Sequence, residues 1–119
     1  MEDPLKRFFA VLTLASLEAL SALGAQLTGY ISDEQCARSG AKAKTAAEWI
    51  KPAAFESCVQ KCVKSGSPAV FVTEDNKILK IDPASMDKVT PHLGHKVSID
   101  GKVEGGTVTI ESITMLKMN

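Results

Sequence analysis

Beyond Pro68 the apolar and polar residues follow a period of two, which is typical of strands because successive side chains point to opposite faces. Turn residues at 74–77 and at 104–106 divide this region into two hairpins. A looser alternation over 26–32, which contains Gly29, predicts one earlier strand with a bend. The four strands of the hairpins are expected at 69–73, 78–81, 95–103 and 107–113.

Two segments have a helical period instead. Pro52 can begin a helix, and apolar residues recur after it at spacings of three and four as far as a glycine. Asp82 and Pro83 are typical of a helix start and predict a short helix that extends to Pro91. The stretch 37–48 has few large apolar residues, so we expect an exposed insertion that is loop or a short helix.

The order of these elements predicts a mainly β fold of the α+β class. We expect a five-stranded β-barrel like that of oligonucleotide/oligosaccharide-binding (OB) domains, with a helix inserted between strands one and two and a short helix between strands three and four. The barrel should occupy 26–119 as a single domain. An open antiparallel sheet with one helix on its face is the alternative.

The first 25 residues predict an export signal. An apolar segment over 8–17 follows two basic residues and precedes small residues, with cleavage expected after Gly24 or Ala25. Glu18 interrupts the apolar stretch, so we expect no stable membrane span after cleavage, and a periplasmic or secreted product. The alternative is an amphipathic cytosolic helix.

Charge and aromatic content argue against a nucleic-acid partner. The chain has 14 basic and 14 acidic residues, and its lysines are scattered among acids instead of forming one basic face. Behind the leader only four aromatic side chains remain, too few for a series of base-stacking platforms. They are Tyr30, Trp49, Phe55 and Phe71.

Three cysteines, Cys36, Cys58 and Cys62, are an odd number for an exported protein, because one disulfide leaves a thiol over. Cys58 and Cys62 lie one turn apart on the expected helix, where a mutual bridge would strain the backbone. A disulfide from Cys36 to Cys58 or Cys62 is therefore our first expectation. In the plainest alternative, the helical cysteines are small buried hydrophobic residues.

The same thiols are candidate metal ligands. Two thiolates on one helical face with a third from another element suit zinc or copper, which prefer soft ligands. His92 or His95 can add an imidazole, and Asp33 can add a carboxylate.

Four motifs carry a resemblance to a known group of proteins. They are Gly-Tyr-Ile-Ser-Asp-x-x-Cys at 29–36, Cys-x-x-x-Cys-Val-x-x-Gly at 58–66, Val-Phe-Val at 70–72 and His-x-Gly-His-Lys-Val-x-Ile-x-Gly at 92–101. Together the motifs resemble small exported bacterial domains of unassigned function with an OB-like fold. The resemblance extends over most of the chain behind the leader and implies export and the barrel, but no activity.

We therefore expect a non-enzymatic binding or structural module without a cofactor, stabilised by a disulfide from Cys36. Its partner would be a protein or a small ligand that contacts the barrel face or the insertion at 37–50. The alternative is a zinc-binding or copper-binding protein. A thiol enzyme would need Cys36 beside His92 or His95, and no catalytic motif in the sequence supports this.

Overall fold

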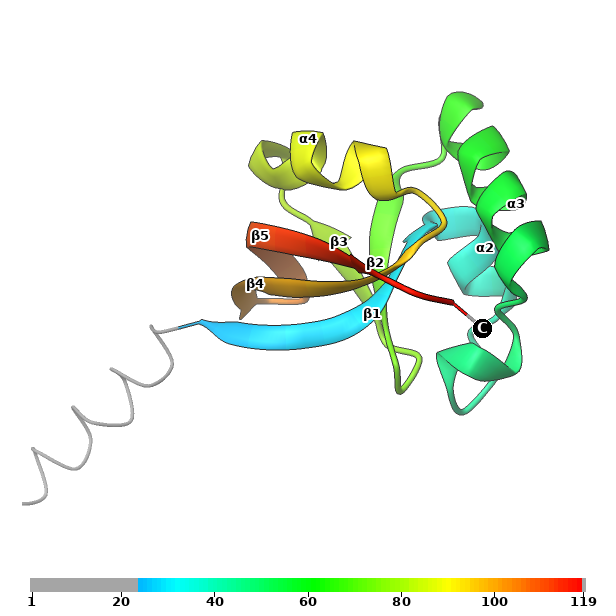
Figure 1. Ribbon diagram of the computed structural model, residues 1–119, viewed down its shortest axis with the longest axis horizontal. Coiled ribbons are helices and arrows are strands. Elements are labelled where there is room, and N and C mark those ends of the chain that lie inside the picture. The colour runs from blue at the N-terminus through cyan, green and yellow to red at the C-terminus, as the bar shows by residue number, and fades with distance from the viewer. Residues whose placement is uncertain (1–23, 119) are drawn as a thin grey trace, which may run out of the picture.

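A computed structural model of the protein describes residues 24–118 (Figure 1). Five strands close on themselves as a barrel in the order β1-β2-β3-β5-β4. The predicted α+β class and both hairpins are confirmed, and the alternative of an open sheet is wrong because β3 and β5 pair in parallel and close the ring. The strands are β1 (Ala25–Asp33), β2 (Ala69–Thr73), β3 (Ile78–Ile81), β4 (Lys96–Glu104) and β5 (Thr107–Leu116).

The long strand β1 holds the two halves of the barrel together. It pairs with β4 from Ala25 to Tyr30 and with β2 from Gly29 to Asp33. A Cβ atom at Gly29 would lie 2.3 Å from the carbonyl oxygen of Val72, so only glycine fits where the strand changes partner. The predicted special position of Gly29 thus corresponds to the crossing of β1 between its two neighbours.

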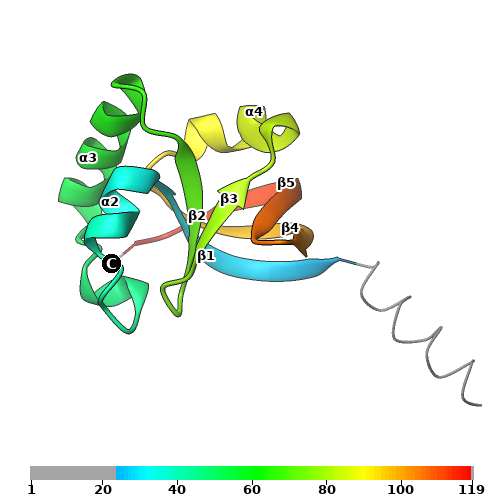
Figure 2. The same cartoon turned by 180° about the vertical axis from the view of Figure 1, so that it is seen from behind.

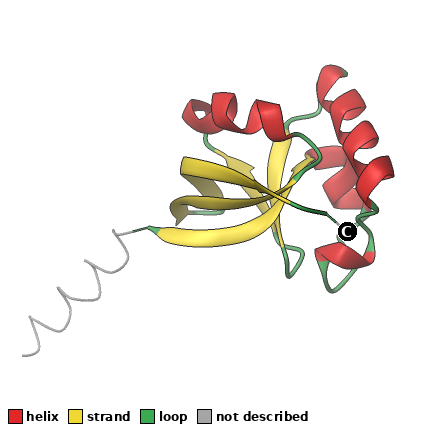
Figure 3. Cartoon of the chain, viewed as in Figure 1, coloured by secondary structure: helices red, strands yellow, loops and turns green. Residues whose placement is uncertain are grey.

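The helices belong to the segments that connect the strands along the chain, and they lie outside the barrel (Figure 3). One group connects β1 to β2 and the other connects β3 to β4, which confirms the predicted positions of the two helical insertions. The first group is α2 (Glu34–Ser39), the 3₁₀ turn η1 (Ala46–Glu48) and α3 (Pro52–Lys64). The second group is η2 (Pro83–Ser85), α4 (Met86–Val89) and η3 (Thr90–His92).

Two apolar clusters share the strand β2. Phe71 points into the barrel interior with Ile31 and Ile99, whereas its neighbours Val70 and Val72 pack outside with Phe55 and Val59 of α3. Both faces of β2 are therefore buried, which explains why its sequence is continuously apolar. Helix α3 is held on the barrel by this outer cluster.

The insertion between α2 and α3 is more tightly packed than its sequence predicts. Ala37 and Ala46 are fully buried, so the expectation of an exposed segment is wrong at these positions. Asn76 links the segment to the β2–β3 turn: its side-chain amide donates hydrogen bonds of 2.8 Å to the carbonyl oxygens of Gly40 and Ala43. Its Oδ1 accepts a 2.8 Å hydrogen bond from Trp49 Nε1. The small residues of this insertion therefore allow close packing and are not a sign of mobility.

The expected signal peptide over 1–25 lies outside the described residues except for Gly24 and Ala25, and Ala25 is the first residue of β1. Within 24–118, no helix combines the length and the apolar character needed to cross a membrane.

Candidate metal centre

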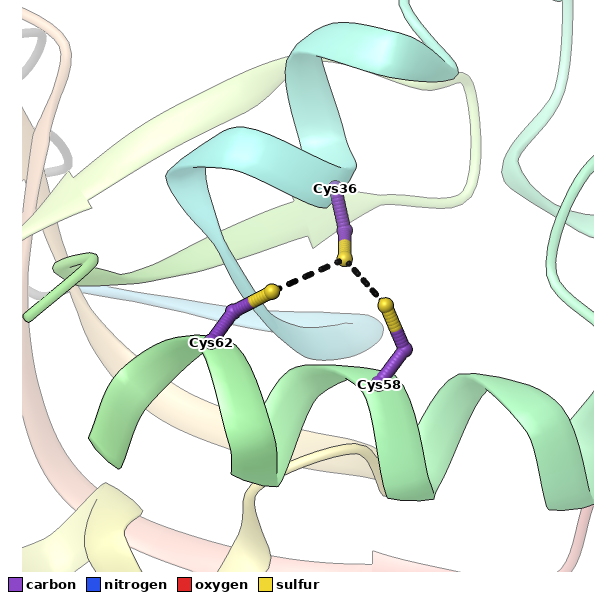
Figure 4. A group of neighbouring side chains, drawn as sticks. All are labelled: Cys36, Cys58 and Cys62. Carbon is purple, nitrogen blue, oxygen red and sulfur yellow. Dashed lines mark hydrogen bonds between the residues drawn. The ribbon is translucent and has the colours of Figure 1, made fainter. Parts of the chain in front are cut away.

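Three sulfur atoms meet where α2 lies beside α3 (Figures 2 and 4). The Sγ atom of Cys36, on α2, is 3.0 Å from that of Cys58 and 4.0 Å from that of Cys62, both on α3. All three sulfurs lie within 4.8 Å of one another. The structure thus brings together all three cysteines that the sequence nominated.

Helix α3 presents its two cysteines beside the buried face, not on it. Phe55 and Val59 contact the barrel, while Cys58 is exposed and Cys62 is half-buried. Residues four apart on a helix share a face, so both thiols point toward α2. The alternative in which the helical cysteines are simply buried hydrophobic residues is therefore wrong for Cys58.

Asp33 places Cys36 over α3. It is the N-cap of α2, and its Oδ2 accepts hydrogen bonds from the backbone N–H groups of Gln35 at 3.0 Å and Cys36 at 3.2 Å. The same oxygen accepts a 2.9 Å hydrogen bond from the hydroxyl of Ser67, just beyond the end of α3. The backbone N–H of Ser67 in turn donates to the carbonyl oxygen of Cys62 at 3.0 Å. One carboxylate thus joins the start of α2 to the end of α3.

Sequence reasoning did not find Ser67. It lies 34 residues from Asp33, and a serine after a helix has no distinctive local pattern. Asp33 was nominated from the sequence only as a possible carboxylate ligand, and its role as an N-cap emerges from the structure. Its position beside the cysteines depended on the fold.

Two thiols of this cluster, those of Cys36 and Cys62, have raised pKa values. Burial raises the pKa of Cys36, and the nearby Asp33 carboxylate and the Cys58 thiol raise it further. Partial burial also raises the pKa of Cys62. Nucleophilic cysteines typically have a lowered pKa, in contrast to Cys36 and Cys62. A bound cation would reverse the balance, because a coordinated thiol loses its proton.

Asp33 carries a second electrostatic feature. Its side chain is fully buried, and its Oδ1 has no hydrogen-bond partner among the described residues. A buried carboxylate oxygen without a donor is unfavourable unless a positive charge or another donor lies near. The three thiols therefore lie beside a buried carboxylate. Among the residues that the structure describes, no hydrogen bond or ion pair joins Asp33 to a basic side chain.

The predicted disulfide is not formed in this structure. All three cysteines are free, and the shortest sulfur–sulfur distance, 3.0 Å, exceeds the bond length of about 2.05 Å. Cys36 nevertheless lies closer to Cys58 than to Cys62, which distinguishes two pairings that the sequence left open.

The two histidines are not brought into the sulfur cluster. Among residues 24–118, the group of potential ligands that meets there consists of the three cysteines alone. His95 instead contacts α3 through Glu56, with Nε2 to Oε2 at 2.8 Å, and its ring packs edge-on to that of His92. Gly94 between them is a close-packing residue, since a Cβ there would lie 2.4 Å from Cα of Glu56.

Searches with the chain against protein-family models, curated proteins and solved structures gave no match.

Proposed function

We propose that the protein is an exported OB-like module that holds one soft metal ion, zinc or copper(I), on the thiolates of Cys36, Cys58 and Cys62. The observation that carries this proposal is the meeting of three sulfurs, from two different helices, within 4.8 Å. Thiolate ligands favour these ions over magnesium or calcium.

The distances support such a site. A zinc–sulfur bond of about 2.3 Å in a tetrahedral site places neighbouring sulfurs about 3.8 Å apart. The separations of the Cys36 sulfur from those of Cys58 and Cys62, 3.0 and 4.0 Å, lie on either side of this value. Cys58 is exposed, so a rotation of its side chain can lengthen the 3.0 Å distance between its sulfur and that of Cys36 without disturbing the core. Three thiolates would leave a fourth position of a tetrahedral site for water or another ligand.

Other observations support the OB-like fold, the export and the non-enzymatic role in this proposal. A closed five-stranded barrel with a short helical segment between β3 and β4 agrees with an OB-like architecture. The apolar leader and the resemblance to exported bacterial domains argue for a periplasmic or secreted protein. A non-enzymatic role agrees with the raised thiol pKa values.

The proposal is tested by metal analysis of the full-length protein purified under reducing conditions. We expect about one zinc or copper(I) ion per chain in native mass spectra, and an intense thiolate charge-transfer band after cobalt(II) substitution. Each of the variants Cys36→Ser, Cys58→Ser and Cys62→Ser should bind more weakly, whereas His95→Ala, outside the cluster, should bind as the wild type does. A folded, reduced protein with three reactive thiols that binds none of these ions would refute the proposal.

A further inference from the structure

The sulfur of Cys36 has two possible disulfide partners, Cys58 and Cys62, and its distances to them differ. We infer that metal binding and a disulfide between Cys36 and Cys58 are two exclusive states of this site, so that oxidation by a small disulfide compound releases the ion. The release rests on the proposed metal-binding function, whereas the choice of disulfide partner does not.

The sulfur distances favour the Cys36–Cys58 pair over Cys36–Cys62, and the positions of the cysteines on the helices disfavour a bond between Cys58 and Cys62. Its sulfurs are 3.0 Å apart, against 4.0 Å for Cys36 and Cys62. The two residues lie on different helices and point toward each other across the gap (Figure 4), as a disulfide requires. Cys58 and Cys62 lie on one helix with parallel Cβ directions, which is an unfavourable arrangement for a bond.

Exposure determines where oxidation begins. Cys58 is the exposed member of the cluster, whereas Cys36 and Cys62 are half-buried. A disulfide compound from solvent therefore meets the sulfur of Cys58 first. Cys36 then lies in contact with the sulfur that has just reacted.

The chemistry balances in two exchange steps. The Cys58 thiolate attacks one sulfur of the compound RSSR, so a mixed disulfide forms and one RS⁻ leaves. The Cys36 thiolate then attacks the Cys58 sulfur, which forms the internal disulfide and expels the second RS⁻. The two cysteines lose two electrons and the compound gains them, while the metal ion keeps its charge. Only Cys62 then remains as a thiolate ligand, and one ligand is too few to retain the ion.

This account gives the odd cysteine a role in both states. With metal bound, Cys62 is the third ligand, and after oxidation it is the spare thiol.

The experiment treats the zinc-loaded, full-length protein with oxidised glutathione. Released zinc is followed with a chromogenic chelator, the intact mass shows the loss of two hydrogens, and peptide mapping locates the bond. We expect one zinc released per disulfide, a bond between Cys36 and Cys58, and an alkylatable Cys62. Cys62→Ser should form the same bond, whereas Cys58→Ser and Cys36→Ser should stop at mixed disulfides with glutathione or remain reduced.

The outcomes distinguish this inference from the proposed function. Zinc that stays bound after the bond has formed, or a dominant bond to Cys62, overturns the inference and leaves metal binding intact. If the reduced protein binds no zinc or copper(I), the proposed function fails and the release fails with it. The bond map of the metal-free protein then still decides whether Cys58 is the partner of Cys36.

Discussion

Replacing Asp33 by alanine should loosen the junction of α2 and α3 on which the proposed metal centre depends. The alanine removes the N-cap of α2, which accepts two backbone hydrogen bonds, and it removes the acceptor of the Ser67 hydroxyl. Loss of an N-cap costs about 1 kcal/mol, and loss of one further hydrogen bond costs about 1 kcal/mol. The expected decrease in the free energy of unfolding is therefore about 2 kcal/mol.

Relief of the unpartnered Oδ1 of Asp33 offsets part of this loss, so about 2 kcal/mol is the upper end of the expected range. For a domain of this size it corresponds to a fall in Tm of about 8–16 °C. Urea unfolding of the reduced, metal-free protein measures the effect without any contribution from a bound ion. The matched control is Ser67→Ala, which removes only the hydroxyl and should lose about 1 kcal/mol.

A second consequence of Asp33→Ala concerns the metal. When the cap is lost, Cys36 is no longer held over α3, and zinc affinity should fall although no ligand has been removed. Competition with a chromogenic chelator measures this change. A loss of stability below about 0.5 kcal/mol together with unchanged zinc affinity would show that Asp33 does not organise the site.

Three further predictions test other parts of the structure. Burial is the main cause of the raised pKa of Cys36, and the Asp33 carboxylate adds to it; Asp33→Asn keeps an N-cap oxygen but removes that carboxylate, so alkylation of Cys36 in the metal-free protein should begin at lower pH, and an unchanged pH profile contradicts this. Gly94→Ala should be much more destabilising than Gly106→Ala in urea unfolding, because the two glycines have φ values of +80° and +78° but only Gly94 is packed against α3; equal losses would refute the packing argument. Burial and the neighbouring histidine lower the pKa of His92, so the unfolded chain binds the proton more readily, and stability should fall as the pH drops below about 6.5. His92→Gln should flatten this pH dependence in thermal unfolding, and an equally steep profile would assign it to other groups.

Local patterns predicted most of the secondary structure. The strand β2 begins and ends at the expected residues, and so does β3, because their apolar residues are bounded by proline and by turn residues. Asp82 caps the helical segment before β4, as its sequence predicts, and its Oδ1 accepts the N–H of Ala84 at 3.1 Å. The last strand runs three residues beyond its predicted end, to Leu116, because pairing with β4 stabilises residues that have no strong preference of their own.

The candidate site was predicted less completely. The three cysteines were identified as a set, but a helical spacing of four gives the direction of Cys58 and Cys62 only relative to each other. Whether the two cysteines face the barrel or α2 depends on which residues of α3 pack in the outer apolar cluster. Phe55 and Val59 occupy that face, and the cysteines are left beside it.

The amino-acid sequence by itself determined the elements of this protein: five strands, two helical insertions, and three thiols that all lie within the first insertion. Such features depend on interactions between residues close in the chain, so periodicity and turn residues reveal them. Tertiary structure decided which distant groups meet. It closed the barrel through β3 and β5, joined Asp33 to Ser67, and kept the histidines apart from the sulfurs. It also placed Cys36 nearer to Cys58 than to Cys62, a difference that arises only when α2 and α3 pack on the same barrel.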